Sequence, residues 1–309
     1  MNELILAFDF GGTKLTAACI ETAGNLKSPA SAWQQQQRIF SPEGADVQYD
    51  IDTMIRMGHE MLAGCRPAAI GVSFGGPVDF ATGTVRLSHH VTGWENVRLK
   101  TLLEDEFDTQ VRVDNDANVA ALGELHFGAG RGFLDMMYIT VSTGVGGGWI
   151  LNGRIWRGHE GMAGEIGHTS VDPHGPPCLC GQNGCVERLA SGPYMAADYA
   201  EAQGGGEAQE ITGKLVAERA AQGDELALRI LRRSSWALGT GIGNAANLVN
   251  PQLFVLGGGV TKAGELWWTA VREAAHHTAL PEVHFDIVPA QLGDDAPLWG
   301  AIALVTYQT

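Results

Sequence analysis

The chain has 309 residues and a formal net charge of −15 at pH 7, and 45% of its residues are hydrophobic. This length suggests two lobes, because single hydrophobic cores usually stop growing near about 250–300 residues. The acidic balance argues against a nucleic-acid surface, which needs clustered Lys and Arg. The first residues lack both a basic segment and a long apolar run, so we expect a cytoplasmic protein without a signal peptide or membrane span.

A glycine-tipped hairpin is predicted at the start of the chain. Residues 4–8 and 15–20 have the apolar content of strands, and the segment DFGGTK at residues 9–14 separates them. Glycines at such a tip let backbone N–H groups approach phosphate oxygens, and a neighbouring acid can hold hydrated Mg²⁺. A P-loop or a dinucleotide fingerprint would need a helix after the glycines. On this hairpin alone, Asp9 is equally well explained as a turn-capping residue.

The next elements alternate between helix and strand. Residues 24–48 are polar and predict a loop, and residues 51–64 predict an amphipathic helix. Residues 69–74 predict a strand that ends in the turn GGPVD at residues 75–79. Ligands in α/β proteins bind at strand ends of this kind.

A strand-to-helix junction follows at residues 114–118. Helices are predicted at residues 99–107 and 117–127, with a strand at 110–113 between them. An N-cap explains one polar residue at such a junction but not an acid and two amides together. We therefore expect Asp116 to be a general base, whereas Asp114 would face the other side if the strand continued.

A second glycine-rich hairpin follows, and later a glycine-rich turn between a strand and a helix. Residues 137–142 predict a strand, residues 143–148 a glycine-rich tip, and residues 149–151 the returning strand. A second phosphate hairpin predicts two related lobes that face each other across a nucleotide. A third site, a strand at 252–256 before three glycines and a helix from near Lys262, suits an adenosine or a ribose.

Residues 165–187 hold three of the five cysteines in a Gly/Pro-rich loop. A closed tetrahedral set of soft or borderline ligands is typical of structural zinc. The candidate ligands are His168, Cys178, Cys180 and Cys185. Free buried thiols or a disulfide are the alternatives, but such dense thiols in a chain with no export signal favour metal. Glu165 and Glu187 flank the loop, which suggests the wall of a polar pocket.

A loop and two further helices are predicted toward the end of the chain. We expect a peripheral loop at residues 202–213 and a helix at 225–248 whose apolar positions are mostly core. A last helix at residues 296–305 is expected to pack back on the first lobe.

These motifs resemble the ROK family of sugar kinases and sugar-responsive repressors, and the resemblance covers essentially the whole chain. It rests on residues 9–14, 75–79, 115–118, 142–148, 165–168, the cysteine signature 178–187, Asn250-Pro251 and Gly257–Gly259. It implies an α/β, two-lobed actin-like ATPase (ribonuclease H-like) fold with a central cleft. We expect a smaller lobe of residues 1–117 plus 295–309 and a larger lobe of residues 118–294.

The resemblance also implies roles for individual residues. Asp116 would be the catalytic base, and the four zinc ligands would be those named above. Sugar contacts are expected from Gly76, His90, Asn115, Asp116, Glu165, His168 and Glu187. ATP and Mg²⁺ contacts are expected from Asp9, Gly11, Gly12, Thr13, Lys14, Thr143, Gly144, Gly146, Gly258 and Gly259. Family repressors carry an N-terminal helix-turn-helix, which we do not expect here because the hairpin starts close to Met1.

Two segments depart from the family pattern near the expected sugar pocket. Where family glucokinases commonly read Ser-Pro-Asn-Leu, this chain has Ser88-His89-His90-Val91, and the turn at Gly75-Gly76 replaces a commoner Pro-Gly. Adjacent histidines in a loop are usually solvated, yet one of them would stand in for an amide that reads a sugar hydroxyl. The identity of the sugar is therefore left open.

The sequence thus predicts an ATP- and Mg²⁺-dependent hexose kinase with a structural Zn²⁺, acting on glucose at O6. Kinases for N-acetylmannosamine, N-acetylglucosamine or fructose are the alternatives of the same chemistry. A sugar-sensing regulator without catalysis is another, and a zinc-held structural module does not explain three glycine turns. We expect a homodimer or higher homo-oligomer, with a hexose and no nucleic acid or membrane as partner.

Overall fold

The computed structural model describes residues 3–22, 33–88, 90–204 and 211–307. These residues form two units. The first comprises Met1–Leu134, Gly148–Ala163 and Gln291–Thr309, and the second comprises Asp135–Gly147 and Gly164–Ala290. The lobe boundaries expected from the sequence stay a prediction.

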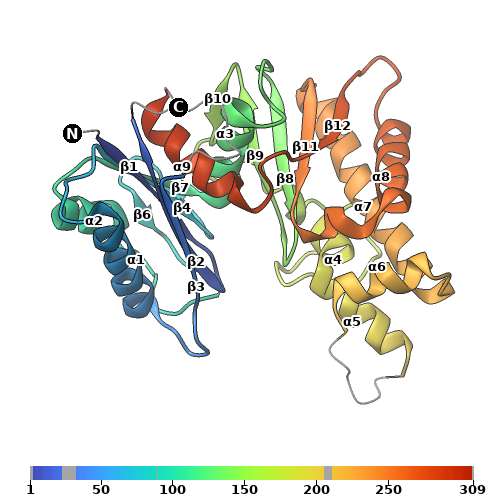
Figure 1. The fold of residues 1–309 in the computed structure, drawn as a ribbon. Coiled ribbons are helices and arrows are strands. Elements are labelled where there is room, and N and C mark those ends of the chain that lie inside the picture. The colour runs from blue at the N-terminus through green and yellow to red at the C-terminus, as the bar shows by residue number, and fades with distance from the viewer. Residues whose placement is uncertain (1–2, 23–32, 89, 205–210, 308–309) are drawn as a thin grey trace. The chain divides into compact units, whose positions relative to one another are not determined.

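The first unit is built on a five-stranded sheet of order β3-β2-β1-β4-β7 (Figure 1). Its strands are β1 (Leu4–Phe10), β2 (Lys14–Glu21), β3 (Gln35–Phe40), β4 (Ala69–Phe74) and β7 (Val111–Asn115). Strands β1, β2 and β3 are antiparallel neighbours, whereas β1, β4 and β7 run parallel. The parallel strands therefore bring their carboxyl ends to the same edge of the sheet.

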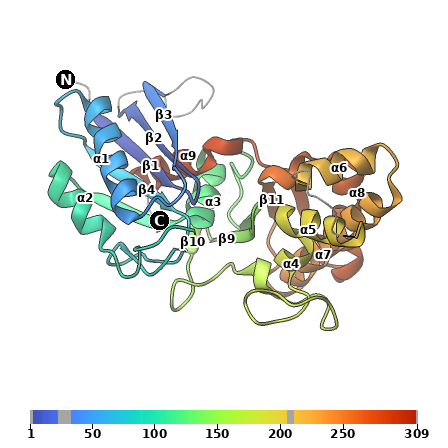
Figure 2. The ribbon, with the colours of Figure 1, turned by 90° about the horizontal axis from the view of Figure 1, so that it is seen from below.

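Helices cover both faces of this sheet. Helices α1 (Val47–Leu62) and α2 (Leu99–Phe107) lie on one face, and α9 (Ala296–Thr306) lies on the other beside α3 (Asp116–Phe127) (Figures 1 and 2). Helix α1 begins where the Asp46 side chain accepts a hydrogen bond from the Tyr49 N–H, a typical N-cap. Gly71 of β4 has no Cβ, and this lets the backbone of α9 approach the sheet at Ala301. The C-terminal helix thus packs on the first unit, as predicted.

A second five-stranded sheet, of order β10-β9-β8-β11-β12, repeats the pairing of the first. Its strands are β8 (Met136–Val141), β9 (Val145–Leu151), β10 (Arg154–Trp156), β11 (Leu253–Gly257) and β12 (Asp286–Pro289). Here too the central strand, β8, has an antiparallel hairpin (β9 and β10) on one side and the parallel strands β11 and β12 on the other. The two sheets are therefore two versions of one topology, as the repeated glycine hairpin predicted.

The remaining elements are short strands and the helices of the second unit. The short strands β5 (Val78–Asp79) and β6 (Thr84–Val85) and the 3₁₀ turn Gly293–Asp295 belong to the first unit. The second unit contains α4 (Val186–Ala190), α5 (Gly192–Ala202), α6 (Gly213–Ala221), α7 (Glu225–Val249), α8 (Glu265–Thr278) and the 3₁₀ turns Ile166–His168 and Gly259–Ala263. Helix α7 packs against α4, α6 and α8. In the part of the chain that the structure describes, no helix is both long and apolar enough to cross a membrane.

The structure differs from the expected elements at residues 24–48 and near Lys262. Residues 24–48 were expected to be loop, but β3 pairs with β2 within them and α1 begins at Val47. The polar sequence of β3 hid it, because an edge strand is held by backbone hydrogen bonds and needs no apolar alternation. The helix expected near Lys262 begins at Glu265, after a 3₁₀ turn. Part of each expected loop lies outside the described residues: residues 24–32 of the loop at 24–48, and residues 205–210 of the loop at 202–213.

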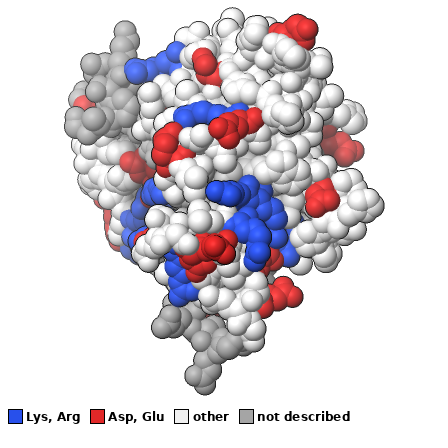
Figure 3. Space-filling model, turned by 90° about the vertical axis from the view of Figure 1, so that its right-hand side faces the viewer, with Lys and Arg blue, Asp and Glu red and all other residues white. Residues whose placement is uncertain are grey.

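Surface charge is unevenly distributed. Figure 3 shows Lys and Arg side chains gathered on part of one face, with Asp and Glu side chains beside them. Some cations in the second unit are paired: Asp198 of α5 accepts two hydrogen bonds of 2.9 Å from Arg188 and another from Arg233. Positive charge is therefore partly neutralised locally, within an acidic chain.

Candidate active site and metal centre

Asp9 lies at the carboxyl edge of the first sheet. It is 6% exposed, and its Oδ1 accepts a hydrogen bond of 2.8 Å from the hydroxyl of Ser73 on the neighbouring strand β4. Burial raises the pKa of the Asp9 carboxyl, although Ser73 and the cations Lys14 and Arg38 oppose this. A carboxylate kept in a buried place is costly without a cation, so its chemistry fits a magnesium ligand.

The glycine hairpin after Asp9 touches the turn that follows β4. The Gly11 N–H donates to the Lys14 carbonyl oxygen at 3.1 Å, which closes the tip. The Gly75 N–H donates to the carbonyl oxygen of Phe10 at 3.0 Å. The predicted phosphate residues and the turn at Gly75-Gly76 are therefore neighbours.

Asn115 and Asp116 complete this edge. Asn115 is the N-cap of α3: its Oδ1 accepts from the Ala117 N–H at 3.0 Å, and its Nδ2 donates to the Gly76 carbonyl oxygen at 3.1 Å. An amide has two N–H donors, so the second is the candidate donor to a sugar hydroxyl. Asp116 is the first residue of α3, and its Oδ2 is 3.9 Å from where a Cβ on Gly75 would lie.

Asp114 has different surroundings. Its side chain is 2% exposed and accepts hydrogen bonds from Arg157 Nε at 2.8 Å, Asn118 Nδ2 at 3.2 Å and the Asn115 N–H at 2.8 Å. Burial raises the pKa of the Asp114 carboxyl, and Arg157 is the main influence that opposes it. The buried acid therefore has a structural role, which leaves Asp116 as the candidate base.

Arg157 is a residue that sequence reasoning missed. Its guanidinium lies 3.5 Å from the centre of the Phe80 ring, and its side chain is 16% exposed. No motif surrounds it, since it follows β10 and its partner Asp114 is 43 positions earlier in the sequence. A lone Arg after a short strand offered no signal for this pairing.

His90 lies against the glycine hairpin at residues 9–14. A Cβ built on Gly12 would come within 2.6 Å of the Cγ and Cδ2 atoms of the His90 ring. The preceding residue, His89, lies outside the described residues. The ring at position 90 is thus a neighbour of a residue expected to hold phosphate.

The glycine turns of the second unit also meet at one edge of their sheet. Strands β8 and β11 are parallel, with Thr140 beside Gly257. Gly258 has a φ of 88° and packs against the backbone of Val141, so only glycine fits there without strain. The turn after β8 is closed by a hydrogen bond of 2.9 Å from the Ser142 N–H to the Gly144 carbonyl oxygen. The predicted nucleotide residues Thr143, Gly144, Gly146, Gly258 and Gly259 therefore occupy one region.

Glu187 joins this region to the cysteine loop. It stands in the first turn of α4, and its Oε2 accepts a hydrogen bond of 2.9 Å from the Val145 N–H. Glu165 precedes the 3₁₀ turn that carries His168, and its carbonyl oxygen accepts from the His168 N–H at 3.0 Å. Gly147 of β9 packs against Ile166 in that turn. The three residues of the second unit that are expected to contact sugar, Glu165, His168 and Glu187, are thus held near its glycine turns.

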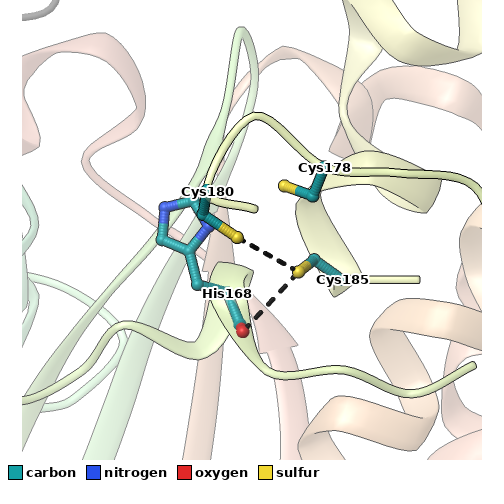
Figure 4. A group of neighbouring side chains, drawn as sticks. All are labelled: His168, Cys178, Cys180 and Cys185. Atoms are coloured by element: carbon teal, nitrogen blue, oxygen red, sulfur yellow. Dashed lines mark hydrogen bonds between the residues drawn. The ribbon is translucent and has the colours of Figure 1, made fainter. Parts of the chain in front are cut away.

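The four predicted metal ligands converge. The ligand atoms of His168, Cys178, Cys180 and Cys185 all lie within 4.8 Å of one another (Figure 4). Tetrahedral zinc with bonds of about 2.0–2.3 Å needs ligand atoms about 3.3–3.8 Å apart. The Sγ atoms of Cys180 and Cys185 are 3.5 Å apart, which fits this spacing and is too long for a disulfide.

The donor set supports the same conclusion. His168 Nδ1 is buried without a hydrogen-bond partner among the described residues, and Figure 4 shows one ring nitrogen facing the sulfur atoms. A backbone hydrogen bond at Gln182 lowers the pKa of the Cys180 thiol to about 7, whereas burial raises that of Cys185 to about 12. A bound cation would deprotonate both thiols and satisfy the orphaned nitrogen. The cluster therefore fits a structural zinc.

Tight turns close the loop, as the glycines predicted. The Gly181 N–H donates to the Cys178 carbonyl oxygen at 3.0 Å, and the Cys178 N–H donates to the Gln182 carbonyl oxygen at 2.8 Å. Gly181 and Gly184 have φ values of 90° and 59°, in the region that favours glycine. These turns bring the cysteines together.

A sequence model described as "ROK family" matches residues 5–308. The chain belongs to the ROK family. It is 36% identical to a glucokinase of Halalkalibacterium halodurans, over 97% of this chain and 94% of that protein. It is 34% identical to an N-acetylmannosamine kinase of Shigella flexneri, over 97% of both chains.

A solved ROK structure agrees with the fold. The ROK glucokinase from Streptomyces griseus, crystallised with glucose and AMPPNP, is 32% identical and superposes with a TM-score of 0.79. The match covers 96% of this chain and 97% of that one. The predicted actin-like ATPase fold is thereby confirmed, and so is the resemblance to ROK sugar kinases.

Proposed function

We propose that this ROK protein is a kinase that transfers the terminal phosphoryl group of ATP to a hexose, with glucose O6 as the acceptor. The observation that carries the proposal is the position of Asp116. Its carboxylate lies beside the Gly75 turn, which is hydrogen-bonded to the glycine hairpin after Asp9. A base, a phosphate hairpin and a buried magnesium-type acid at one sheet edge are the parts that phosphoryl transfer needs.

In this proposal Asp116 accepts the proton of the attacking hydroxyl. A positioned base of this kind contributes about 10²–10⁴ in rate. The backbone N–H groups of the glycine turns hold the triphosphate, and Asp9 is the candidate ligand that keeps Mg²⁺ on it. Positioning and charge compensation make up most of the catalysis of phosphoryl transfer.

The second unit would supply most of the sugar contacts. We assign sugar hydroxyls to Glu165, His168 and Glu187 there, and to Gly76 and Asn115 in the first unit. If His168 binds zinc through the buried Nδ1, its other nitrogen carries the proton and can donate to a hydroxyl. The zinc would then shape the sugar site without contacting phosphate.

The choice of glucose is the finer part of the proposal. Relatives named glucokinase and N-acetylmannosamine kinase match at 36% and 34% identity, so overall similarity does not separate the two sugars. N-acetylglucosamine and fructose need the same chemistry. A regulator without catalysis is the alternative from another class, and the intact acids at positions 9 and 116 favour the enzyme.

Release of ADP in a coupled assay across a sugar panel tests the proposal. The panel should contain glucose, N-acetylmannosamine, N-acetylglucosamine and fructose, each with MgATP, and NMR should locate the phosphate on the product. We expect turnover with glucose and a product phosphorylated at O6. Sugar binding by calorimetry without ADP release for any sugar would support the regulator instead. We also expect the protein to be cytoplasmic and to form a homodimer or larger homo-oligomer. Light scattering would measure the molar mass of the assembly.

A further inference from the structure

The histidine at position 90 is presented to the phosphate hairpin by a turn that is fixed on both sides. The Ser88 hydroxyl oxygen accepts hydrogen bonds of 3.2 Å from the backbone N–H groups of His90 and Val91. Val91 is 7% exposed and belongs to the core of the first unit. The backbone of His90 is therefore held, and the residue as a whole is exposed to solvent.

The same core anchors the hairpin. Trp94 is buried, and its ring centre lies 5.5 Å from that of Phe10 and 4.7 Å from that of Phe74. Phe10 directly precedes the glycine tip, and Phe74 directly precedes Gly75. One aromatic cluster thus positions the His90 turn, the phosphate hairpin and the Gly75 turn with respect to one another.

The contact at the tip is close. The ring atoms of His90 occupy the space into which a side chain at position 12 would extend, 2.6 Å from an ideal Cβ. A phosphate oxygen bound by N–H groups at the tip would lie about 2.9 Å from the donating nitrogen. A ring that already touches Gly12 is within reach of such a phosphate.

Under the proposed function, that phosphate is the one transferred. The acceptor hydroxyl must lie next to Asp116, whose carboxylate is beside Gly75, and Gly75 is hydrogen-bonded to Phe10 at the base of the tip. The phosphoryl group nearest to the acceptor is the terminal one. The ring at position 90 is consequently close to that group.

We propose that His90 is a nucleotide-binding residue, whose imidazole N–H donates a hydrogen bond to the terminal phosphate of ATP. This assignment rests on the proposed function and moves His90 from the sugar to the phosphate. An imidazole carries at least one N–H in either protonation state. Its Nε2 is three bonds from Cβ, one bond farther than the nitrogen of an Asn side chain, so His reaches a group that the amide expected at this position in family glucokinases would not.

The test compares the binding of AMPPNP and of ADP to the variants His90→Asn and His90→Ala. The comparison separates a contact with the terminal phosphate from a contact with the rest of the nucleotide. Both ligands are measured by calorimetry with Mg²⁺ and without sugar, so no turnover is required. A hydrogen bond to a charged group typically contributes enough to affinity that its loss weakens binding about ten- to hundredfold. We expect that loss for AMPPNP, and a change of less than about twofold for ADP, which lacks the terminal phosphate. The exposed His277 of α8 provides the control His277→Asn, for which both affinities should stay unchanged.

Kinetics and a second variant sharpen the test. The His90 variants should raise KM for ATP and leave KM for the sugar and the order of the sugar panel unchanged. Gly12→Ala should displace the ring, so its effect on AMPPNP binding should be smaller in the His90→Ala background than in the wild type. Equal weakening of AMPPNP and ADP, a changed sugar preference, or additive effects of the two substitutions would each overturn the assignment. A wild-type protein that binds AMPPNP but phosphorylates no sugar would overturn the proposed function alone.

Discussion

Arg157 donates a hydrogen bond of 2.8 Å from Nε to the buried carboxylate of Asp114. Asp114 lies two residues before the candidate base, Asp116. The pair lies where β7 ends and α3 begins, so it supports the backbone that carries Asn115 and Asp116. Breaking a buried pair by removing one partner leaves an uncompensated charge, which typically costs about 3–5 kcal/mol.

Arg157→Leu should therefore lower the free energy of unfolding by about 3–5 kcal/mol. Without the guanidinium, the already raised pKa of Asp114 rises further. An acid whose folded-state pKa is raised contributes stability below its unfolded pKa and loses it as pH rises through the folded value. The variant should consequently be closest to the wild type in acid and weakest at neutral pH, as measured by urea unfolding between pH 4 and pH 8.

A matched control is available on α1. Arg56 and Glu60 form an exposed pair of 3.0 Å, with side chains 51% and 52% exposed. Such pairs contribute about 0.3–0.5 kcal/mol, so Arg56→Leu should change stability little. If the two Arg variants were equally stable, the buried pair would have no special role.

Asp9→Asn should stabilise the fold and abolish activity. Because burial raises the pKa of the Asp9 carboxyl, the ionised form at neutral pH opposes folding, and an amide of the same shape removes that cost. We expect a gain of about 0.5–2 kcal/mol in the free energy of unfolding at pH 7, which should shrink as pH falls and Asp9 takes up its proton. If the variant were less stable than the wild type, ionised Asp9 would not oppose folding. If its Mg²⁺-dependent turnover were normal, Asp9 would not be a magnesium ligand.

Asp116→Asn should reduce kcat by about 10²–10⁴ and leave the affinity for sugar within a few-fold of the wild type. The amide keeps the shape of the side chain but cannot accept the proton. Steady-state assays and calorimetry measure the two quantities. The control is Asp108→Asn, whose side chain is 88% exposed, and near-normal turnover by Asp116→Asn would exclude it as the base.

Cys180→Ser should lower both the zinc content and the melting temperature. A structural zinc site contributes directly to folding, and three remaining ligands hold the metal less tightly. Plasma mass spectrometry and thermal unfolding, each with and without a chelator, provide the measurements. Cys65 is exposed and outside the cluster, so Cys65→Ser should retain metal and stability. Full zinc occupancy in the Cys180 variant would remove this thiol from the ligand set.

Much of the local structure could be read from the sequence because its causes are local. Apolar runs bounded by glycine predicted β1, β4 and β8 closely. A charged segment predicted α2, and the helical spacing of apolar residues predicted α7. The spacing of the cysteines predicted a convergence with His168 that the structure confirms. The edge strand β3 was missed because backbone pairing with β2, and not its own polar residues, makes it a strand.

The sequence by itself determined which chemical groups the protein carries: glycine-rich tips, acids at strand ends, and one histidine with three cysteines of the kind that bind zinc. Tertiary structure alone decided which of these groups meet. Arg157 is hydrogen-bonded to Asp114, 43 positions away in the sequence, and Glu187 to the Val145 N–H, 42 positions away. His90 contacts Gly12 across 78 positions. Such contacts depend on strand register and on packing between distant segments, and no local pattern of residues encodes them.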